Sequence, residues 1–253
     1  MGILTVEDAQ IIFVDTPGIH KPHHKLGEWM NKEAEESLDE CDVICLLVDL
    51  SQPPHEEDHL IASRLTRMRR NAPILLVFNK LDLISISTLD GKKQAYQNLL
   101  PWTESIAISA TRGDNLDILL SMLKVYLPVH PPFFPEDQVT DLYEREIVSN
   151  LIREAALFHL RAEVPHSLAV RIDEFKERQD GNTYIAATLF VERQSQKVIV
   201  IGQGAAMLKK IGMSARQEIE KMLNRHIYLE LRVKVRKNWR NDESALRQFG
   251  YKP

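Results

Sequence analysis

The chain has 253 residues, of which 44% are hydrophobic and 27% charged, with a formal net charge of −4. This balance is typical of a globular protein with a sizeable core, and no apolar run approaches the ~18 residues of a membrane span. The first ten residues lack the layout of a secretory signal, and two cysteines are too few for a disulfide framework or a zinc site. We therefore expect a cytoplasmic protein, neither fibrous nor disordered.

Charge is divided unequally along the chain. Residues 1–139 hold 12 Lys and Arg against 21 Asp and Glu, a net charge of −9. Residues 140–253 hold 20 against 15, a net charge of +5, and residues 185–253 alone carry +8. This asymmetry predicts two domains with different partners, the basic one facing a polyanion. Solvated surfaces that merely differ in charge are the plainer alternative.

In chain order, the first half alternates apolar runs with amphipathic stretches. The runs predict strands at residues 10–15, 42–49, 74–79 and 105–109. Helical spacing of apolar residues predicts helices near 26–38 and 115–127, and both cysteines fall in the second predicted strand or at its start. Continuous apolar runs separated by helices are typical of parallel strands buried on both faces. We expect a doubly wound α/β sheet, with ligands beyond the carboxyl ends of the strands.

The second half has a different order of elements. Residues 128–137 contain four prolines and predict a semi-rigid linker. The elements that follow are a helix at 140–161, strands at 167–175 and 184–192 joined by an Asp-Gly turn, an apolar run at 198–201, a glycine-rich bend, a helix at 214–224 and a strand at 228–235. The predicted order is α-β-β-α-α-β.

Asp15-Thr16-Pro17-Gly18 follows the first predicted strand. An aspartate at this point can reach Mg²⁺ through water, and a glycine amide can meet a terminal phosphate that side chains would block. An ordinary Pro-Gly turn is the alternative.

Asn79-Lys80-Leu81-Asp82 ends the third predicted strand. The Asp82 carboxylate can accept hydrogen bonds from guanine N1–H and its 2-amino group, Asn79 can brace the loop, and the Lys80 stem can cover the ring. Ser109-Ala110-Thr111 ends the fourth strand, where a backbone amide can meet the guanine oxygen. A polar turn is the alternative at each position.

The order and spacing of the three motifs resemble a Ras-like guanine-nucleotide domain. With Ile19-His20-Lys21-Pro22 and Leu26-Gly27 added, essentially the whole chain resembles the Era family of bacterial GTPases, which join such a domain to a C-terminal KH RNA-binding domain. The resemblance implies GTP or GDP and Mg²⁺ as cofactors. The nucleotide-binding residues implied are Asp15, Thr16, Pro17, Gly18, Ile19, Asn79, Lys80, Leu81, Asp82, Ser109 and Ala110, with Asp15 at the metal.

Two departures concern catalysis. The 253 residues contain no G-x-x-x-x-G-K-[ST] phosphate loop, since their one Gly-Lys pair, Gly91-Lys92, has Ile86 and Lys93 at the other motif positions. In the family this loop lies upstream, so we expect a chain lacking roughly the first 50–60 residues, with poor GTP binding and negligible hydrolysis. Ile19 replaces the glutamine that orients water in Ras-type enzymes, so no catalytic residue is assigned.

Ile201-Gly202-Gln203-Gly204-Ala205 resembles the G-x-x-G loop of KH domains, which lets a single-stranded RNA backbone approach closely. Ala205 replaces the fourth glycine and restricts positive φ, which predicts weaker phosphate contact. Ile201 and Ile211 are expected to form part of the apolar floor of the groove that holds the bases. Phosphate contacts are expected from the basic residues Lys197, Lys209, Lys210 and Arg216. A glycine-rich helix start without a ligand is the alternative.

Alternation of Arg232, Lys234 and Arg236 with apolar residues in the last strand fits two interpretations equally. These side chains extend the basic surface, or they form the solvent side of an amphipathic strand.

The prediction is an incomplete Ras-like P-loop GTPase sheet followed by an α+β type II KH domain. The expected boundaries are 1–128 for the GTPase domain, 129–139 for the linker, 140–238 for the KH domain and 239–253 for a tail. The resemblance implies a monomer that binds small-subunit ribosomal RNA and the 30S subunit in ribosome assembly, with peripheral contact to the inner membrane.

Three alternatives stay open. One is a non-catalytic RNA-binding assembly module with a relic nucleotide domain. Another is a Der-like GTPase, although the glycine loop and the single nucleotide domain argue against it. The third is a first domain left unfolded because a missing central strand exposes apolar edges.

Overall fold

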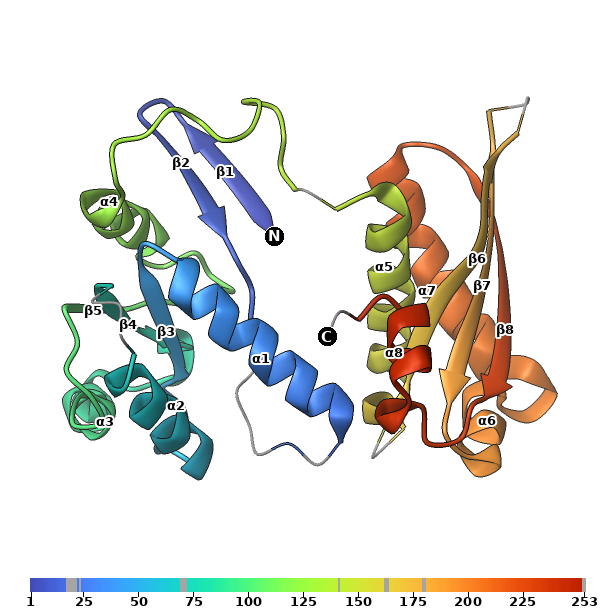
Figure 1. Ribbon diagram of the computed structural model, residues 1–253, viewed down its shortest axis with the longest axis horizontal. Helices are drawn as coiled ribbons and strands as arrows, with labels where there is room; N and C mark the ends of the chain where they lie inside the picture. The colour runs from blue at the N-terminus through green and yellow to red at the C-terminus, as the bar shows by residue number, and fades with distance from the viewer. Residues whose placement is uncertain are drawn as a thin grey trace. The chain divides into compact units, whose positions relative to one another are not determined.

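The computed structural model describes residues 1–16, 22, 24–68, 72–140, 142–161, 164–178 and 181–251. The chain forms two compact units (Figure 1). Unit 1 comprises residues 1–22 and 30–140, and unit 2 comprises residues 23–29 and 141–253. Each unit has its own hydrophobic core.

Unit 1 contains a parallel sheet in the order β3-β4-β5. Its strands are β3 (Ile44–Asp49), β4 (Ile74–Asn79) and β5 (Glu104–Ala107). Its helices are α2 (Glu56–Thr66), α3 (Ile86–Gln97), α4 (Leu116–Tyr126) and the part of α1 (Lys25–Glu40) from Met30 onward. The residues of β4 alternate between two cores: Leu76 and Phe78 pack with α2, whereas Leu75 and Val77 pack with α4. The central strand is thus buried on both faces, as its continuous apolar run predicts.

The first predicted strand is present, but the expectation that it joins the parallel sheet was wrong. Residues 10–15 correspond to β2 (Ala9–Phe13), which pairs antiparallel with β1 (Gly2–Val6) across a two-residue turn. Among the described residues this hairpin is a separate sheet from β3-β4-β5. The hairpin packs against the parallel sheet through Ile11, which shares a hydrophobic core with Leu75 and Val77 of β4.

Strand β3 also differs from the expectation of burial on both faces. Ile44, Leu46 and Val48 are buried, but Cys45 and Leu47 between them are exposed. Cys41 lies outside the strand, directly after α1. Within the described chain β3 pairs with β4 alone, so one of its edges carries no neighbour to cover these side chains.

The proline-rich segment runs along the hairpin. The Gln10 side chain accepts hydrogen bonds from the Phe133 and Phe134 amides at 2.8 and 3.0 Å and donates to the Phe134 carbonyl at 2.9 Å. The Ile3 amide donates to the Val139 carbonyl at 2.9 Å. These contacts fix the backbone of the segment within unit 1.

Unit 2 confirms the predicted order α-β-β-α-α-β. Its elements are α5 (Glu144–His159), β6 (Ala169–Glu177), β7 (Thr183–Val191), α6 (Gln194–Ile201), α7 (Ala206–Leu223) and β8 (Ile227–Val235). Strand β7 is central, antiparallel to β6 and parallel to β8, and α5 and α7 lie on one side of the sheet (Figure 1). The apolar run 198–201 is the end of α6, and α7 begins eight residues before the predicted start.

The C-terminal segment packs on the same unit. Trp239 is 1% exposed, and its Nε1 donates to the Ser167 carbonyl at 3.0 Å. Asp242 caps α8 (Glu243–Gln248) by accepting from the amides of Ser244 and Ala245. In the described residues no single helix is long and apolar enough to cross a bilayer; α6 and α7 reach that threshold only jointly, as a pair bent by 42°.

Candidate nucleotide and RNA sites

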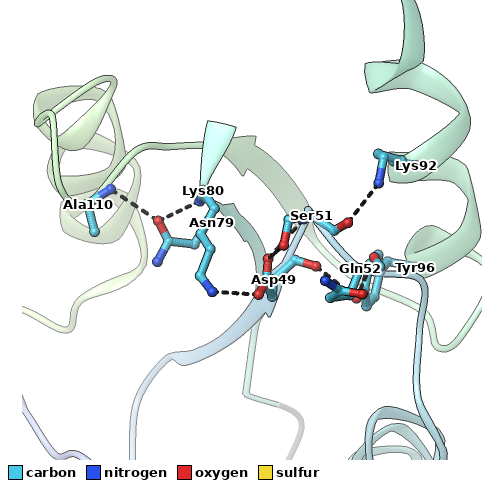
Figure 2. Close-up of polar contacts among 8 residues, drawn as sticks. All are labelled: Asp49, Ser51, Gln52, Asn79, Lys80, Lys92, Tyr96 and Ala110. Carbon is cyan, nitrogen blue, oxygen red and sulfur yellow. Dashed lines mark hydrogen bonds and ion pairs between the residues drawn. The ribbon is translucent and has the colours of Figure 1, made fainter. Parts of the chain in front are cut away.

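The predicted guanine motifs meet at one edge of the unit 1 sheet. Asp49 and Asn79 are register partners at the carboxyl ends of β3 and β4, and Ser109 follows β5. Because the three strands are parallel, their carboxyl ends share this edge, and Figure 2 shows the polar side chains that gather there.

Asn79 ties two of the motifs together. Its Oδ1 accepts hydrogen bonds from the Lys80 amide at 2.7 Å and the Ala110 amide at 3.1 Å (Figure 2). Asp82 is held in the same way, because its Oδ1 accepts from the Ser109 hydroxyl at 2.7 Å, and Ser109 is fully buried. The structure therefore brings Asn79, Asp82, Ser109 and Ala110 together.

Lys80 has a partner that the sequence analysis missed. Its Nζ lies 2.6 Å from Asp49 Oδ2, and Asp49 Oδ1 accepts from the Ser51 amide and hydroxyl at 2.9 and 2.6 Å (Figure 2). Burial acts to raise the pKa of Asp49, but the hydrogen bonds from Lys80 and Ser51 outweigh it and lower the pKa to about 2. The available signal was the position of Asp49 at a strand end beside Asn79.

The loop after β3 is anchored by α3. The Tyr96 hydroxyl donates to the Asp49 and Gln52 carbonyls at 3.1 and 3.2 Å, and Lys92 Nζ donates to the Ser51 carbonyl at 3.1 Å (Figure 2). Burial raises the pKa of Tyr96 to about 12, so this hydroxyl keeps its proton as a donor across the neutral range.

The arrangement at this edge fits the base of a guanine nucleotide. The hydrogen bond from Ser109 to Oδ1 orients the Asp82 carboxylate, which keeps further lone pairs for two N–H donors. The Leu81 side chain packs against the α2 core, so it anchors the loop. No phosphate loop is present in the sequence to cradle the β-phosphate or to supply a lysine and a magnesium ligand.

The motif after β2 is described only in part. Asp15 is exposed and Thr16 half-buried, whereas Pro17, Gly18 and Ile19 lie outside the described residues. In the ranges that the structure covers, no hydrogen bond or ion pair joins Asp15 to the other two motifs. Those ranges also contain no group of three or more His, Cys, Asp or Glu that could hold a metal.

In unit 2 the predicted RNA loop connects α6 to α7. Gly202, Gly204 and Ala205 have φ of +73°, +56° and +62°. A Cβ on Gly202 would lie 2.8 Å from the Met207 Cβ and amide nitrogen, whereas a Cβ on Gly204 would point into open space. The loop therefore requires glycine at 202, for both conformation and space. Ala205 adopts the left-handed conformation despite its methyl group, at a cost of about 1 kcal/mol.

The loop leads directly into the first turn of α7, an 18-residue helix whose leading amides have no partner within the helix. Lys209 and Lys210 on this helix are exposed and, in the described part of the chain, form no ion pair. Arg216 differs, since it pairs with Glu220 at 3.1 Å. Positive helix dipole, open backbone and unpaired lysines all favour an anion at this point.

The structure revises two of the expectations for this surface. Ile211 is fully buried in the core of unit 2, so it cannot floor an RNA groove; only Ile201 is partly exposed. Along β8, Arg232 pairs with Glu230 at 2.6 Å and Arg236 with Asp242 at 2.8 Å. These pairs favour the interpretation of the alternating charges as the solvent side of the strand.

Comparisons with known proteins agree with this architecture. A family model described as a KH domain matches residues 163–240, and one described as a 50S ribosome-binding GTPase matches residues 1–80. Era from Aquifex aeolicus, in a crystal structure bound to GDP·AlF4⁻, is 38% identical over 100% of this chain and 86% of its own, with a TM-score of 0.93. The chain belongs to the Era family. The predicted Ras-like GTPase domain followed by a KH domain is thereby confirmed.

A second Era structure is similar to the same extent. It is 38% identical, with a TM-score of 0.91, over 100% of this chain and 85% of its own. That protein was crystallised with MgGDPNP and nucleotides 1506–1542 of 16S ribosomal RNA.

Proposed function

We propose that this chain binds single-stranded RNA near the end of the small-subunit ribosomal RNA, through the loop at residues 202–205, during assembly of the 30S subunit. The observation that carries the proposal is the loop itself. Three of its four residues have positive φ, and Gly202 lies where any side chain would collide with Met207. The RNA-bound Era structure, at 38% identity, supports the choice of RNA.

The contact follows from the geometry of the loop. Gly204 carries no side chain and borders open space, so a phosphate can approach the loop backbone there, and the start of α7 adds its dipole. Lys209 and Lys210 supply mobile positive charge for neighbouring phosphates. Ile201 gives an apolar contact for bases held beside the loop.

We infer that nucleotide binding by these 253 residues is weak and confined to the base. Asp82, Asn79 and the Ala110 amide would recognise guanine, and Lys80 would cover its face. Asp15, with Thr16, Pro17, Gly18 and Ile19, belongs to the phosphate and magnesium side of the same proposed site. Without a phosphate loop the phosphates contribute little to the free energy of nucleotide binding, and GTP hydrolysis is negligible.

The cellular setting is proposed from the family resemblance alone. We place the chain in the cytoplasm as a monomer, with peripheral contact to the inner membrane. The alternative function is an RNA-binding assembly module whose nucleotide domain is a relic. It is favoured if the chain binds no guanine nucleotide even at millimolar concentration, whereas the main proposal expects weak binding through the base.

The experiment is a fluorescence-anisotropy titration with RNA of the sequence of nucleotides 1506–1542 of 16S ribosomal RNA. Gln203→Glu keeps the shape of the loop and places a carboxylate where the phosphate would lie, so it should weaken binding by about tenfold or more. Gln217→Glu, the same change on α7 away from the loop, is the control. Equal affinities for both variants would contradict the loop as the RNA site.

A further inference from the structure

Next to the RNA loop, unit 2 has a hollow of about 440 Å³. It is lined by His159, Leu160, Arg161, Ile199, Met207 and Lys210, which come from the end of α5, from α6 and from α7. We call it the α5–α7 hollow. Its wall is continuous with the loop, because Met207 is the residue that a side chain at Gly202 would strike.

The lining combines apolar side chains with positive charge. Leu160, Ile199 and Met207 are apolar, and Ile199 is 48% exposed. Arg161 and Lys210 are exposed and, within the described ranges, form no ion pair. An apolar surface between two free cations suits a ligand with flat, uncharged parts joined by anionic links, which describes bases and phosphates.

An aromatic side chain stands beside the hollow. Phe158 is 83% exposed, and its ring lies at 84° to the ring of His159, with 5.1 Å between the centroids. His159 is fixed in turn, since its Nε2 lies 2.8 Å from the Ser214 hydroxyl oxygen. An exposed aromatic ring next to cations is the composition of a stacking platform for single-stranded nucleic acid.

We propose that the α5–α7 hollow and Phe158 form a second RNA contact, which takes nucleotides adjacent to those held by residues 202–205. The proposal rests on the proposed function and extends it. A KH loop clamps only about four nucleotides, so a longer strand needs a further surface to follow. RNA is favoured over a lipid surface because the hollow is concave and its wall continues into the loop at Met207.

The test compares two oligoribonucleotides with the full chain. A 6-nucleotide probe spans the loop alone, and a 12-nucleotide probe that contains it extends beyond the loop. Phe158→Ala and Arg161→Gln should each weaken binding of the longer probe, Phe158→Ala by about tenfold, and leave the shorter probe within twofold. Photocrosslinking with 5-iodouridine placed beyond the loop segment should label Phe158.

The matched controls lie on α5 and α7. Tyr143→Ala removes another exposed aromatic at the opposite end of α5, and Lys221→Gln removes an exposed lysine at the far end of α7. Neither should change the affinity for either probe. All four side chains project to solvent, so circular dichroism should show unchanged folding.

The outcomes separate the two proposals. If neither probe binds the unaltered chain, the proposed function itself fails. If both bind and Phe158→Ala leaves the longer probe unaffected, the hollow is not an RNA site. Loss of binding to vesicles of phosphatidylglycerol and phosphatidylethanolamine in Phe158→Ala, with RNA affinity unchanged, would assign the surface to lipid and overturn the inference.

Discussion

The RNA loop of unit 2 and the guanine edge of unit 1 are built in opposite ways. Residues 202–205 form one continuous segment, and its backbone conformation is complete within this chain. The guanine edge is assembled from the ends of three strands, and its residues Asn79 and Asp82 are braced by groups from the segment after β5. A site made by one segment depends on local geometry, whereas a site made by several strands depends on every contributor.

The largest expected effect tests the local geometry of the loop. Gly202→Ala places a methyl group 2.8 Å from Met207 at a φ of +73°, so it should lower the free energy of unfolding of unit 2 by about 3 kcal/mol. Urea unfolding followed by tryptophan fluorescence measures this. Gly204→Ala, with open space around its Cβ, should lose only about 1 kcal/mol. Equal losses would contradict the clash with Met207.

The next effect tests the shared bracing of the guanine edge. Asn79→Ala removes the acceptor of the Lys80 and Ala110 amides and should destabilise unit 1 by about 2 kcal/mol. Faster hydrogen exchange should appear at both amides, which lie in different loops. Exchange that rises at Lys80 alone would show that the two motifs are not coupled.

A smaller effect of opposite sign is expected at Ala205. Ala205→Gly relieves the left-handed strain of a residue at φ +62° and should stabilise unit 2 by up to about 1 kcal/mol, less the entropy that glycine gains on unfolding. It should also tighten RNA binding a few-fold by removing the methyl from the loop. Weaker RNA binding by this variant, measured by anisotropy, would show that the methyl group contributes to the contact.

The smallest effect concerns acid stability. The folded pKa of Asp49 is about 2, below the ordinary 3.8 of an aspartate, so its contribution is complete above about pH 4. The contribution is lost as the pH falls from there through 2. Asp49→Asn should therefore flatten the dependence of unit 1 stability on pH in this window, measured by thermal unfolding at successive pH values. An unchanged profile would contradict the ion pair with Lys80.

Sequence patterns predicted the central elements better than the edges. The strand Ile74–Asn79 is buried on both faces, so its run of apolar residues is continuous and its limits were predicted correctly. The hairpin β1–β2 was missed because its strands are five residues long and a run of apolar residues does not reveal the direction of pairing. The start of α7 was missed because Gly202, Gly204 and Ala205 look like an extended bend.

The sites show the same contrast. Asn79, Asp82, Ser109 and Ala110 were recognised from motifs at strand ends, and the structure brings them together. Asp49 was missed because its role depends on its register with Asn79, which no local pattern encodes. The α5–α7 hollow was missed for the same reason, since its lining comes from three helices that meet only in the folded unit.

The most direct test of the central claim is a titration of the chain with the 16S ribosomal RNA segment, in the presence and absence of Mg²⁺ and GTP. The account predicts binding that Gln203→Glu weakens and that the nucleotide leaves unchanged, because the 253 residues contain the RNA loop but no phosphate-loop motif. Absence of RNA binding, or an RNA affinity that responds to micromolar GTP, would contradict it.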